Sequence, residues 1–155
     1  MFFQSDTPMS FRYALSDGEW KKRLPGPSYL VLRQAQTERP FTSPLVNEHR
    51  QGRFVCMGCN WPLFSSKTKF ESGTGWPSFF EPYDPDHVIG ITDRSYGMVR
   101  TETRCARCDS HQGHVFPDGP PPSRLRYCIN SVSLQFVMNG EPLPDPLGRG
   151  DRLPD

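Results

Sequence analysis

Hydrophobic and polar residues alternate in several short stretches of the chain, which is the pattern of β-strands with one buried face. The clearest stretch, residues 125–136, is rich in β-branched and aromatic side chains and is predicted to form one continuous strand. Two further strands are predicted at residues 88–92 and 96–104. In the second of these, alternation places four side chains on one face: Met98, Arg100, Glu102 and Arg104.

Two short helices are predicted ahead of the strands. Ser16 and Glu19 have the spacing of a capping box, so a helix is expected to run from there to about Leu24. A second helix is expected to begin at Pro27 or Ser28, since proline is favoured in a first helical turn. Both are expected to lie at the periphery of the core, with three candidate anchors: Tyr29, Leu30 and Leu32.

Glycine and proline interrupt the chain often enough to limit long elements. The 17 prolines and 13 glycines among 155 residues favour short strands joined by turns. Residues 72–80 are expected to form a shaped loop that presents aromatic side chains, and neither a regular helix nor a central strand. The sequence therefore predicts a single, mainly β domain over residues 15–140, after an extension at 1–14 and before a proline-rich, flexible tail at 141–155.

Charge and hydropathy exclude several classes of protein. The formal net charge is only +1, so no general basic surface for nucleic acid is expected. Mean hydropathy is −0.63, and no apolar run approaches the roughly 20 residues that cross a bilayer. The first residues do not resemble a secretory signal. We expect a monomeric cytoplasmic protein that binds neither nucleic acid nor membranes.

Four of the five cysteines form two CxxC pairs, Cys56 with Cys59 and Cys105 with Cys108. Two such pairs supply the four thiolates of a closed, structural zinc site. The alternatives are two disulfides, one redox-active pair, or four unrelated buried thiols. A structural zinc is the favoured interpretation, because such sites use a CxxC motif repeated along a chain.

The fifth cysteine, Cys128, lies in the predicted strand at 125–136. Arg126, Cys128 and Asn130 are two residues apart and share one face of that strand. The cation favours the thiolate and the amide can bind a polar substrate atom, which suits a nucleophile. The strand alone leaves open the alternative of a small buried core residue.

The segment after the second CxxC pair carries two histidines, His111 and His114. Three interpretations stay open: zinc ligands in a Cys2His2 site, solvated loop residues, or proton donors above Cys128. Trp76, held between Gly75 and Pro77, is well placed to line a pocket for a small apolar group.

Further motifs accompany the two CxxC pairs in a fixed order along the chain: Gly75-Trp76-Pro77-Ser78-Phe79, His111-x-Gly113-His114-Val115-Phe116, Asp118-Gly119-Pro120 and Arg126-Tyr127-Cys128-Ile129-Asn130-Ser131. Over roughly residues 15–136 the chain resembles the methionine-R-sulfoxide reductase B family. The resemblance implies two antiparallel sheets, often called a β-tent, with short N-terminal helices and a structural zinc opposite a catalytic cleft. It also implies reduction of the R epimer of methionine sulfoxide, in proteins or free.

The resemblance implies roles for individual residues. Cys128 would attack the sulfoxide sulfur and become a sulfenic acid, which a thiol can reduce. His114, Asn130 and His111 would bind a water or the sulfoxide oxygen as it takes up a proton, and Arg126 would support the thiolate. Trp76 and Phe116 would hold the ε-methyl group of the substrate.

Two positions depart from the family pattern. Thr74 stands where many members have a resolving cysteine, so we expect a single catalytic cysteine whose sulfenic acid is reduced by thioredoxin or a small thiol. Gln112 stands where the family usually has leucine, and is expected to make the wall of the cleft more polar. The alternative to an enzyme is a zinc-stapled β-tent module that binds a peptide or small ligand without turnover.

Overall fold

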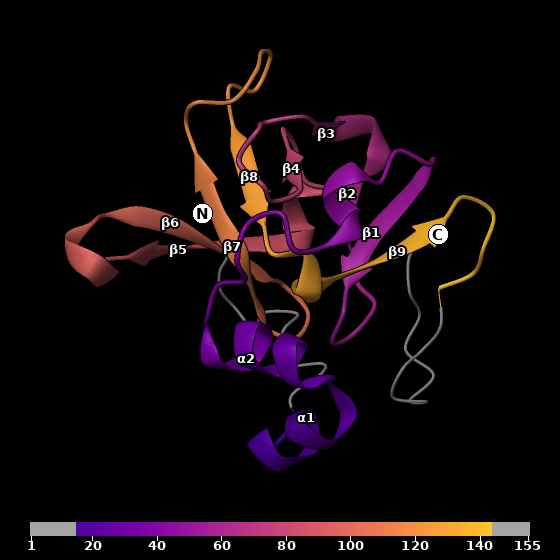
Figure 1. The fold of residues 1–155 in the computed structure, drawn as a ribbon, viewed down its shortest axis with the longest axis vertical. Coiled ribbons are helices and arrows are strands. Elements are labelled where there is room, and N and C mark those ends of the chain that lie inside the picture. The colour runs from indigo at the N-terminus through magenta and orange to yellow at the C-terminus, as the bar shows by residue number, and fades with distance from the viewer. Residues whose placement is uncertain (1–14, 144–155) are drawn as a thin grey trace.

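The computed structural model describes residues 15–143, so the expected extension at 1–14 and most of the expected tail lie outside the described residues. The described chain forms two antiparallel sheets and two short helices, as predicted (Figure 1). The smaller sheet has the order β2 (Pro62–Ser65), β1 (Gly52–Cys56), β9 (Leu134–Met138). The larger has the order β3 (Lys69–Phe70), β4 (Ser78–Phe79), β8 (Arg126–Ile129), β7 (His111–Phe116), β6 (Arg100–Cys105), β5 (Val88–Asp93).

The helices are α1 (Asp17–Arg23) and α2 (Gly26–Gln34). The predicted capping box of α1 is confirmed, because Ser16 Oγ accepts a hydrogen bond from the Glu19 amide and the Ser16 amide donates to Glu19 Oε1. In α2, Tyr29 and Leu32 are buried as expected. Leu30 is 42% exposed, so the prediction that it anchors the helix to the core was wrong. The helix packs through the face that carries Val31 instead, about 100° away around the helix axis.

Residues 125–136 do not form one strand. β8 ends at Ile129, a short 3-10 turn covers Ser131–Ser133, and β9 begins at Leu134 in the other sheet. The apolar alternation continues across this turn because both strands bury one face. Alternation alone does not show that the chain passes from one sheet to the other.

The predicted strand at 96–104 begins four residues later than expected. Tyr96 has a φ of +57° and Gly97 a φ of +70°, so the chain turns there before β6 begins at Arg100. The expected loop at 72–80 also differs, because Ser78 and Phe79 form the short strand β4 between β3 and β8. Its prolines and glycines all precede that strand, which leaves Ser78 and Phe79 able to pair.

Aromatic side chains from both sheets form the core between them. Phe64 of the smaller sheet stacks on Phe79 of the larger sheet with ring centroids 4.4 Å apart, and Phe54 meets Phe79 edge-on at 5.1 Å. Tyr127, one residue before Cys128, packs at the edge of this cluster, 5.5 Å from Phe64. The core therefore fixes β8 through residues that alternate with Cys128.

The helices cover one end of the larger sheet, beside β7 and the 131–133 turn, and the β5–β6 hairpin projects from the body of the fold (Figure 1). Within residues 15–143, neither helix combines the length and the apolar composition needed to cross a membrane.

Candidate active site and metal site

Strand register places Cys128 directly opposite His114. In the β7–β8 pair, His114 is the partner of Cys128 and Gly113 is the partner of Ile129. Ile129 points into the core, so His114 and Cys128 point together to the opposite, outer face. In the β6–β7 pair Glu102 is the partner of His114, which places a carboxylate on the same face.

A register shift near Gln112 turns the two histidines to the same side. Thr103 pairs with Gly113 and Arg104 pairs with His111, so Gln112 is the additional residue of a β-bulge. Without the bulge, residues three apart on a strand would point to opposite faces. With it, the rings of His111 and His114 lie 5.6 Å apart in an edge-on arrangement.

Gly113 allows β7 and β8 to approach closely beside Cys128. A Cβ atom at this position would lie 2.1 Å from the carbonyl oxygen of Cys128, so a side chain cannot be accommodated without moving one strand. The small residue between the two histidines therefore sets the separation of His114 and Cys128.

Cys128 is partly exposed and opens onto a pocket of about 110 Å³. Five of the predicted site residues meet there: Cys128, His114, Asn130, Trp76 and Phe116. Thr37 and Arg100, which were not among the predicted site residues, complete the lining together with Gly113. Cys128 is thus neither enclosed by hydrocarbon nor part of the four-cysteine cluster described below.

The Trp76 loop is held in place by the segment that follows α2. The Trp76 indole nitrogen donates to the backbone carbonyl of Glu38 at 3.2 Å, and the Phe41 amide donates to the carbonyl of Gly75 at 2.8 Å. Gly75 has a φ of +91°, and a Cβ there would lie 2.6 Å from Cβ of Pro40. Glycine is therefore required immediately before Trp76.

Asn130 is buried and already holds two backbone groups. Its Oδ1 accepts from the Glu38 amide at 2.9 Å, and its Nδ2 donates to the Gln112 carbonyl at 3.0 Å. One Nδ2 hydrogen therefore remains beyond these two contacts. The amide of Asn130 joins the Glu38 segment to β7 at the wall of the pocket.

Two opposing effects act on the Cys128 thiol. Burial raises its pKa above the usual value, while a 3.9 Å contact with Thr74 Oγ1 and the charge of Arg126 act to lower it. The net pKa is raised because the effect of burial exceeds that of these neighbours, although the charge of Arg126 acts in the predicted direction. Arg126 binds Asp118 through two hydrogen bonds and lies 4.5 Å above the Phe116 ring, and so its charge is partly neutralised.

His114 is bound by a carboxylate from the β5–β6 hairpin. Its Nε2 lies 2.7 Å from Asp93 Oδ2, and Arg100 donates to the same oxygen at 3.3 Å. Hydrogen bonds from His114 and from the Ser95 backbone hold the pKa of Asp93 well below its usual range. Burial lowers the pKa of His114 despite the bond to Asp93, which favours a neutral imidazole near pH 7.

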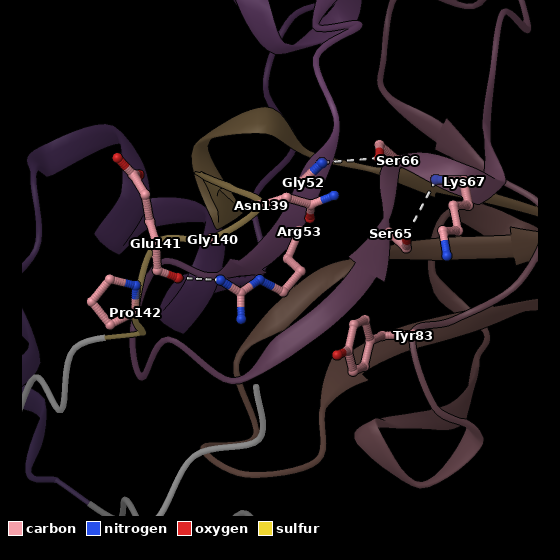
Figure 2. Close-up of a pocket in the computed structure, with 10 residues that line it drawn as sticks. All are labelled: Gly52, Arg53, Ser65, Ser66, Lys67, Tyr83, Asn139, Gly140, Glu141 and Pro142. Atoms are coloured by element: carbon pink, nitrogen blue, oxygen red, sulfur yellow. Dashed lines mark hydrogen bonds between the residues drawn. The ribbon is translucent and has the colours of Figure 1, made fainter.

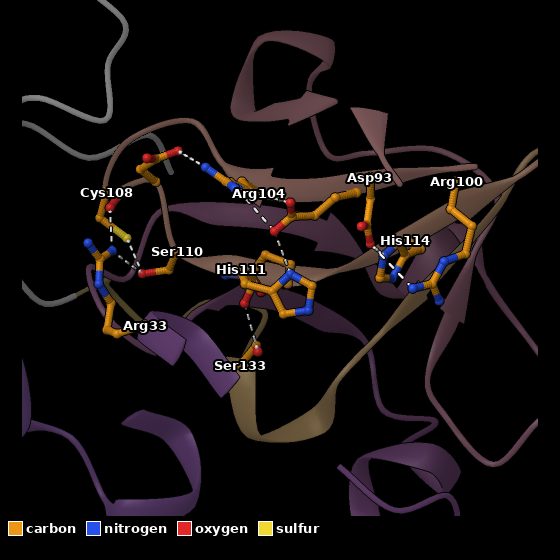
Figure 3. A network of polar contacts seen from close by, with 12 residues as sticks. Arg33, Asp93, Arg100, Arg104, Cys108, Ser110, His111, His114 and Ser133 are labelled. Atoms are coloured by element: carbon orange, nitrogen blue, oxygen red, sulfur yellow. Dashed lines mark hydrogen bonds and ion pairs between the residues drawn. The ribbon is translucent and has the colours of Figure 1, made fainter. Parts of the chain in front are cut away.

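His111 is separated from the pocket of Cys128. It is 95% buried and lines a second pocket beside α2, where Nδ1 lies 2.7 Å from Glu102 Oε2 (Figure 3). Arg104 binds the same carboxylate through Nε and Nη2. Burial acts to raise the pKa of Glu102, but the hydrogen bonds from His111 and Arg104 outweigh it and hold that pKa at about 2.

The carboxylates Asp93 and Glu102 are site residues that sequence reasoning missed. Single acidic residues on a strand or at its end have no characteristic spacing to the histidines they bind. The only available signal was the alternation in β6, which placed Arg100, Glu102 and Arg104 on one face, as the structure confirms. Only the register of β5, β6 and β7 shows that Asp93 and Glu102 lie beside the two histidines.

Gln112 does not contribute to the wall of the cleft, which corrects the expectation for this residue. It is fully buried on the core side of β7, and its Nε2 donates to Cys56 Sγ at 3.5 Å. The bulge that brings His111 to the outer face directs Gln112 inward. The amide therefore contacts the four-cysteine cluster and not the pocket of Cys128.

Four buried cysteines cluster on the core side of the sheets, away from Cys128. The Sγ atoms of Cys56, Cys59, Cys105 and Cys108 all lie within 4.8 Å of one another. The shortest separations, 3.5 and 3.6 Å, are too long for disulfides. A tetrahedral site with Zn–S bonds of about 2.3 Å has sulfur–sulfur edges of about 3.8 Å, so this donor set fits a metal ion.

Amides and arginines surround the cluster. The Gly58 and Arg107 amides each approach a sulfur at 3.4 Å, as in sites that stabilise thiolates. Arg33 of α2 donates to the Cys108 carbonyl at 2.8 Å and to Ser110 Oγ at 3.1 Å (Figure 3). Its guanidinium also lies 4.8 Å above the ring of Trp20 in α1. The two helices are thereby fastened to the cluster.

Comparison with known proteins agrees with this arrangement. The SelR domain family matches residues 24–138. A peptide methionine sulfoxide reductase MsrB of Caulobacter vibrioides is 67% identical over 123 residues, covering 79% of this chain and 77% of that protein. Proteins of the same name from Xylella fastidiosa and Agrobacterium fabrum are 56% and 54% identical over 121 residues, covering 78% of this chain and 78% and 90% of theirs.

The fold, the single pocket cysteine and these relatives define an oxidoreductase, and the non-catalytic binding module is set aside. The chain belongs to the methionine-R-sulfoxide reductase B family, whose members reduce methionine sulfoxide.

Proposed function

We propose that this protein reduces the R epimer of methionine sulfoxide, bound in proteins or free, with Cys128 as the nucleophile. The observation that supports the proposal is the pocket shared by Cys128, His114, Asn130, Trp76 and Phe116. A lone thiol beside an imidazole, an amide and two aromatic rings supplies a nucleophile, a proton carrier, a polar anchor and an apolar wall.

The first step moves one proton and one oxygen atom. The raised pKa of Cys128 and the lowered pKa of His114 favour a neutral thiol–imidazole pair before substrate binds. His114 takes the thiol proton as the sulfur of Cys128 attacks the sulfoxide sulfur, and passes it to the sulfoxide oxygen. The S–O bond of the substrate then breaks, the hydroxyl is transferred to Cys128, and methionine leaves beside a cysteine sulfenic acid.

The remaining site residues orient the reactants. Trp76 and Phe116 hold the ε-methyl group, which fixes the side from which the oxygen is presented and thus the epimer. The second Nδ2 hydrogen of Asn130 binds the oxygen as negative charge develops on it. Arg126 stabilises the thiolate as it forms. His111 acts through its neighbour His114, since its own ring lies outside the pocket.

The sulfenic acid is reduced by an external thiol. Among residues 15–143, the four cysteines other than Cys128 are buried together in the cluster, and the loop places the hydroxyl of Thr74 against the Cys128 sulfur. Thioredoxin or a small thiol therefore attacks Cys128, releases water, and forms a mixed disulfide that a second thiol resolves. The enzyme acts as a monomer with one catalytic cysteine.

Zinc is the metal that best suits the four-cysteine cluster. Four thiolates form the closed site that structural zinc prefers, with no position for water, so the ion supplies stability and no chemistry. Cys56, Cys59, Cys105 and Cys108 would hold it and join β1 to β6.

The test measures reduction of separate R and S epimers of a methionine sulfoxide peptide with dithiothreitol. The unaltered protein should reduce only the R epimer, and Cys128→Ser should have no activity while retaining its circular dichroism spectrum. Turnover of the S epimer, or activity in Cys128→Ser, would refute the assignment.

A further inference from the structure

A separate pocket lies on the smaller sheet and does not involve the residues of the proposed active site. Its volume is about 480 Å³, within the range of about 300–1,000 Å³ usual for small-molecule sites. Residues from β1, from the end of β2 and from the turn after β9 line it (Figure 2). Its side chains are mostly polar: Arg53, Ser65, Ser66, Lys67, Tyr83, Asn139 and Glu141.

Arg53 is the feature of this pocket that requires explanation. It lies in the central strand of the smaller sheet and is only 9% exposed, yet it carries a permanent positive charge. Within residues 15–143, no carboxylate forms an ion pair with it. Its Nη2 donates a hydrogen bond to the neutral backbone carbonyl of Glu141, whose side chain points away from the guanidinium (Figure 2). Buried charges are normally paired with an opposite charge.

Further donors surround the guanidinium. Ser65 is the cross-strand partner of Arg53, so both side chains are on one face of the sheet. The Ser65 oxygen accepts from the Lys67 amide at 3.1 Å, which leaves its hydroxyl hydrogen able to donate toward the pocket. Lys67 adds a second cation at the rim. The pocket thus combines two cations and a hydroxyl with one acidic side chain, Glu141, that is turned outward (Figure 2).

We propose that this pocket binds a small organic oxyanion, a compound whose phosphate or carboxylate group pairs with Arg53 and Lys67. The planar guanidinium presents two parallel N–H groups, which match the spacing of two oxygens on either kind of group. Ser65 donates a third hydrogen bond. The site is separate from the reduction of methionine sulfoxide, and the inference does not depend on the function proposed above.

The test is isothermal titration calorimetry of the zinc-loaded full chain with inorganic phosphate and, separately, with acetate, at constant ionic strength. At least one of the two anions should bind saturably with one site per chain. The better probe identifies the group: phosphate for a tetrahedral oxyanion, acetate for a carboxylate. Lys67→Gln should weaken binding several-fold, and Arg53→Gln by about tenfold or more, as expected for loss of charge-assisted hydrogen bonds.

Two controls separate this site from general electrostatic attraction. Lys22→Gln removes one exposed charge from α1 and should leave the affinity unchanged. Because Arg53 is buried, the folding of Arg53→Gln is checked against the unaltered protein by circular dichroism and by sulfoxide reduction. Lys67 is exposed, so Lys67→Gln provides a second variant that does not disturb the core. The proposal would be overturned if neither anion bound saturably. It would also be overturned if folded Arg53→Gln and Lys67→Gln bound the anion as tightly as the unaltered protein does.

Discussion

The hydroxyl of Thr74 lies 3.9 Å from the sulfur of Cys128. Gly73 precedes Thr74 with a φ of +77° and has open space around it, so the chain can adjust on that side of Thr74. A cysteine in this position would therefore be close enough to reach Cys128 after a small movement.

We predict that Thr74→Cys forms an internal disulfide after one turnover. Mass spectrometry should detect a loss of two hydrogens in this variant, whereas the unaltered protein gains one oxygen that dimedone traps. Thr92→Cys, at an exposed position of β5, serves as the matched control and should behave like the unaltered protein. An internal disulfide at Cys128 in the unaltered protein would show that the single-cysteine scheme is incorrect.

Loss of Arg126 should make Cys128 harder to ionise. The guanidinium lowers the pKa of the thiol against the effect of burial, and Asp118 raises it, so Arg126→Gln removes the favourable charge and leaves the unfavourable one. The pH dependence of Cys128 alkylation by iodoacetamide should therefore shift to higher pH. Arg124→Gln, an exposed residue on the same connection, is the control. An unchanged profile in Arg126→Gln would exclude this role.

The hydrogen bond that His114 donates to Asp93 should be needed for proton transfer by His114. Asp93 raises the pKa of His114, so Asp93→Asn should lower that pKa further and weaken the imidazole as a base. We expect kcat to fall roughly tenfold, part of the about 10²–10⁴-fold that general acid–base catalysis supplies. The acid limb of the pH–kcat profile, where His114 becomes protonated, should move to lower pH.

Asp86→Asn removes a carboxylate from the exposed turn before β5 and should change neither kcat nor the acid limb. If Asp93→Asn lowers kcat with an unshifted acid limb, then Asp93 only supports the hairpin.

Zinc removal should destabilise the fold. We expect one zinc per chain by elemental analysis, and none in Cys108→Ser. Even about 4 kcal/mol of lost stability would lower the thermal midpoint by about 10 °C, at about 2–4 °C per kcal/mol for a chain of this size. Cys128→Ser should retain the metal. Zinc loss in that variant would contradict the separation of the two thiol sites.

The sequence predicted the elements whose signals are local. The capping box at Ser16 specified the start of α1, and the two CxxC pairs specified a cluster of four thiols. The pocket residues Cys128, His114, Asn130, Trp76 and Phe116 were found from motifs and do meet.

What the sequence did not predict depends on register and on passage between sheets. Alternation continues through the 131–133 turn, so β8 and β9 looked like one strand. The bulge at Gln112 reverses the sides of His111 and Gln112, which no spacing rule shows in advance. Asp93 and Glu102 became partners of the histidines only through antiparallel pairing across three strands.

The segment around Glu38 links the tryptophan and the asparagine of the pocket through its own main chain. The Glu38 carbonyl accepts a hydrogen bond from the Trp76 indole, and the Glu38 amide donates one to Asn130. The Glu38 carboxylate accepts a hydrogen bond from the Val132 amide. Because the first two contacts use main-chain atoms that every residue except proline possesses, a change of side chain at position 38 is compatible with an assembled pocket. A change in the number of residues between α2 and Pro40 is not, since one insertion would misalign both crevice walls together.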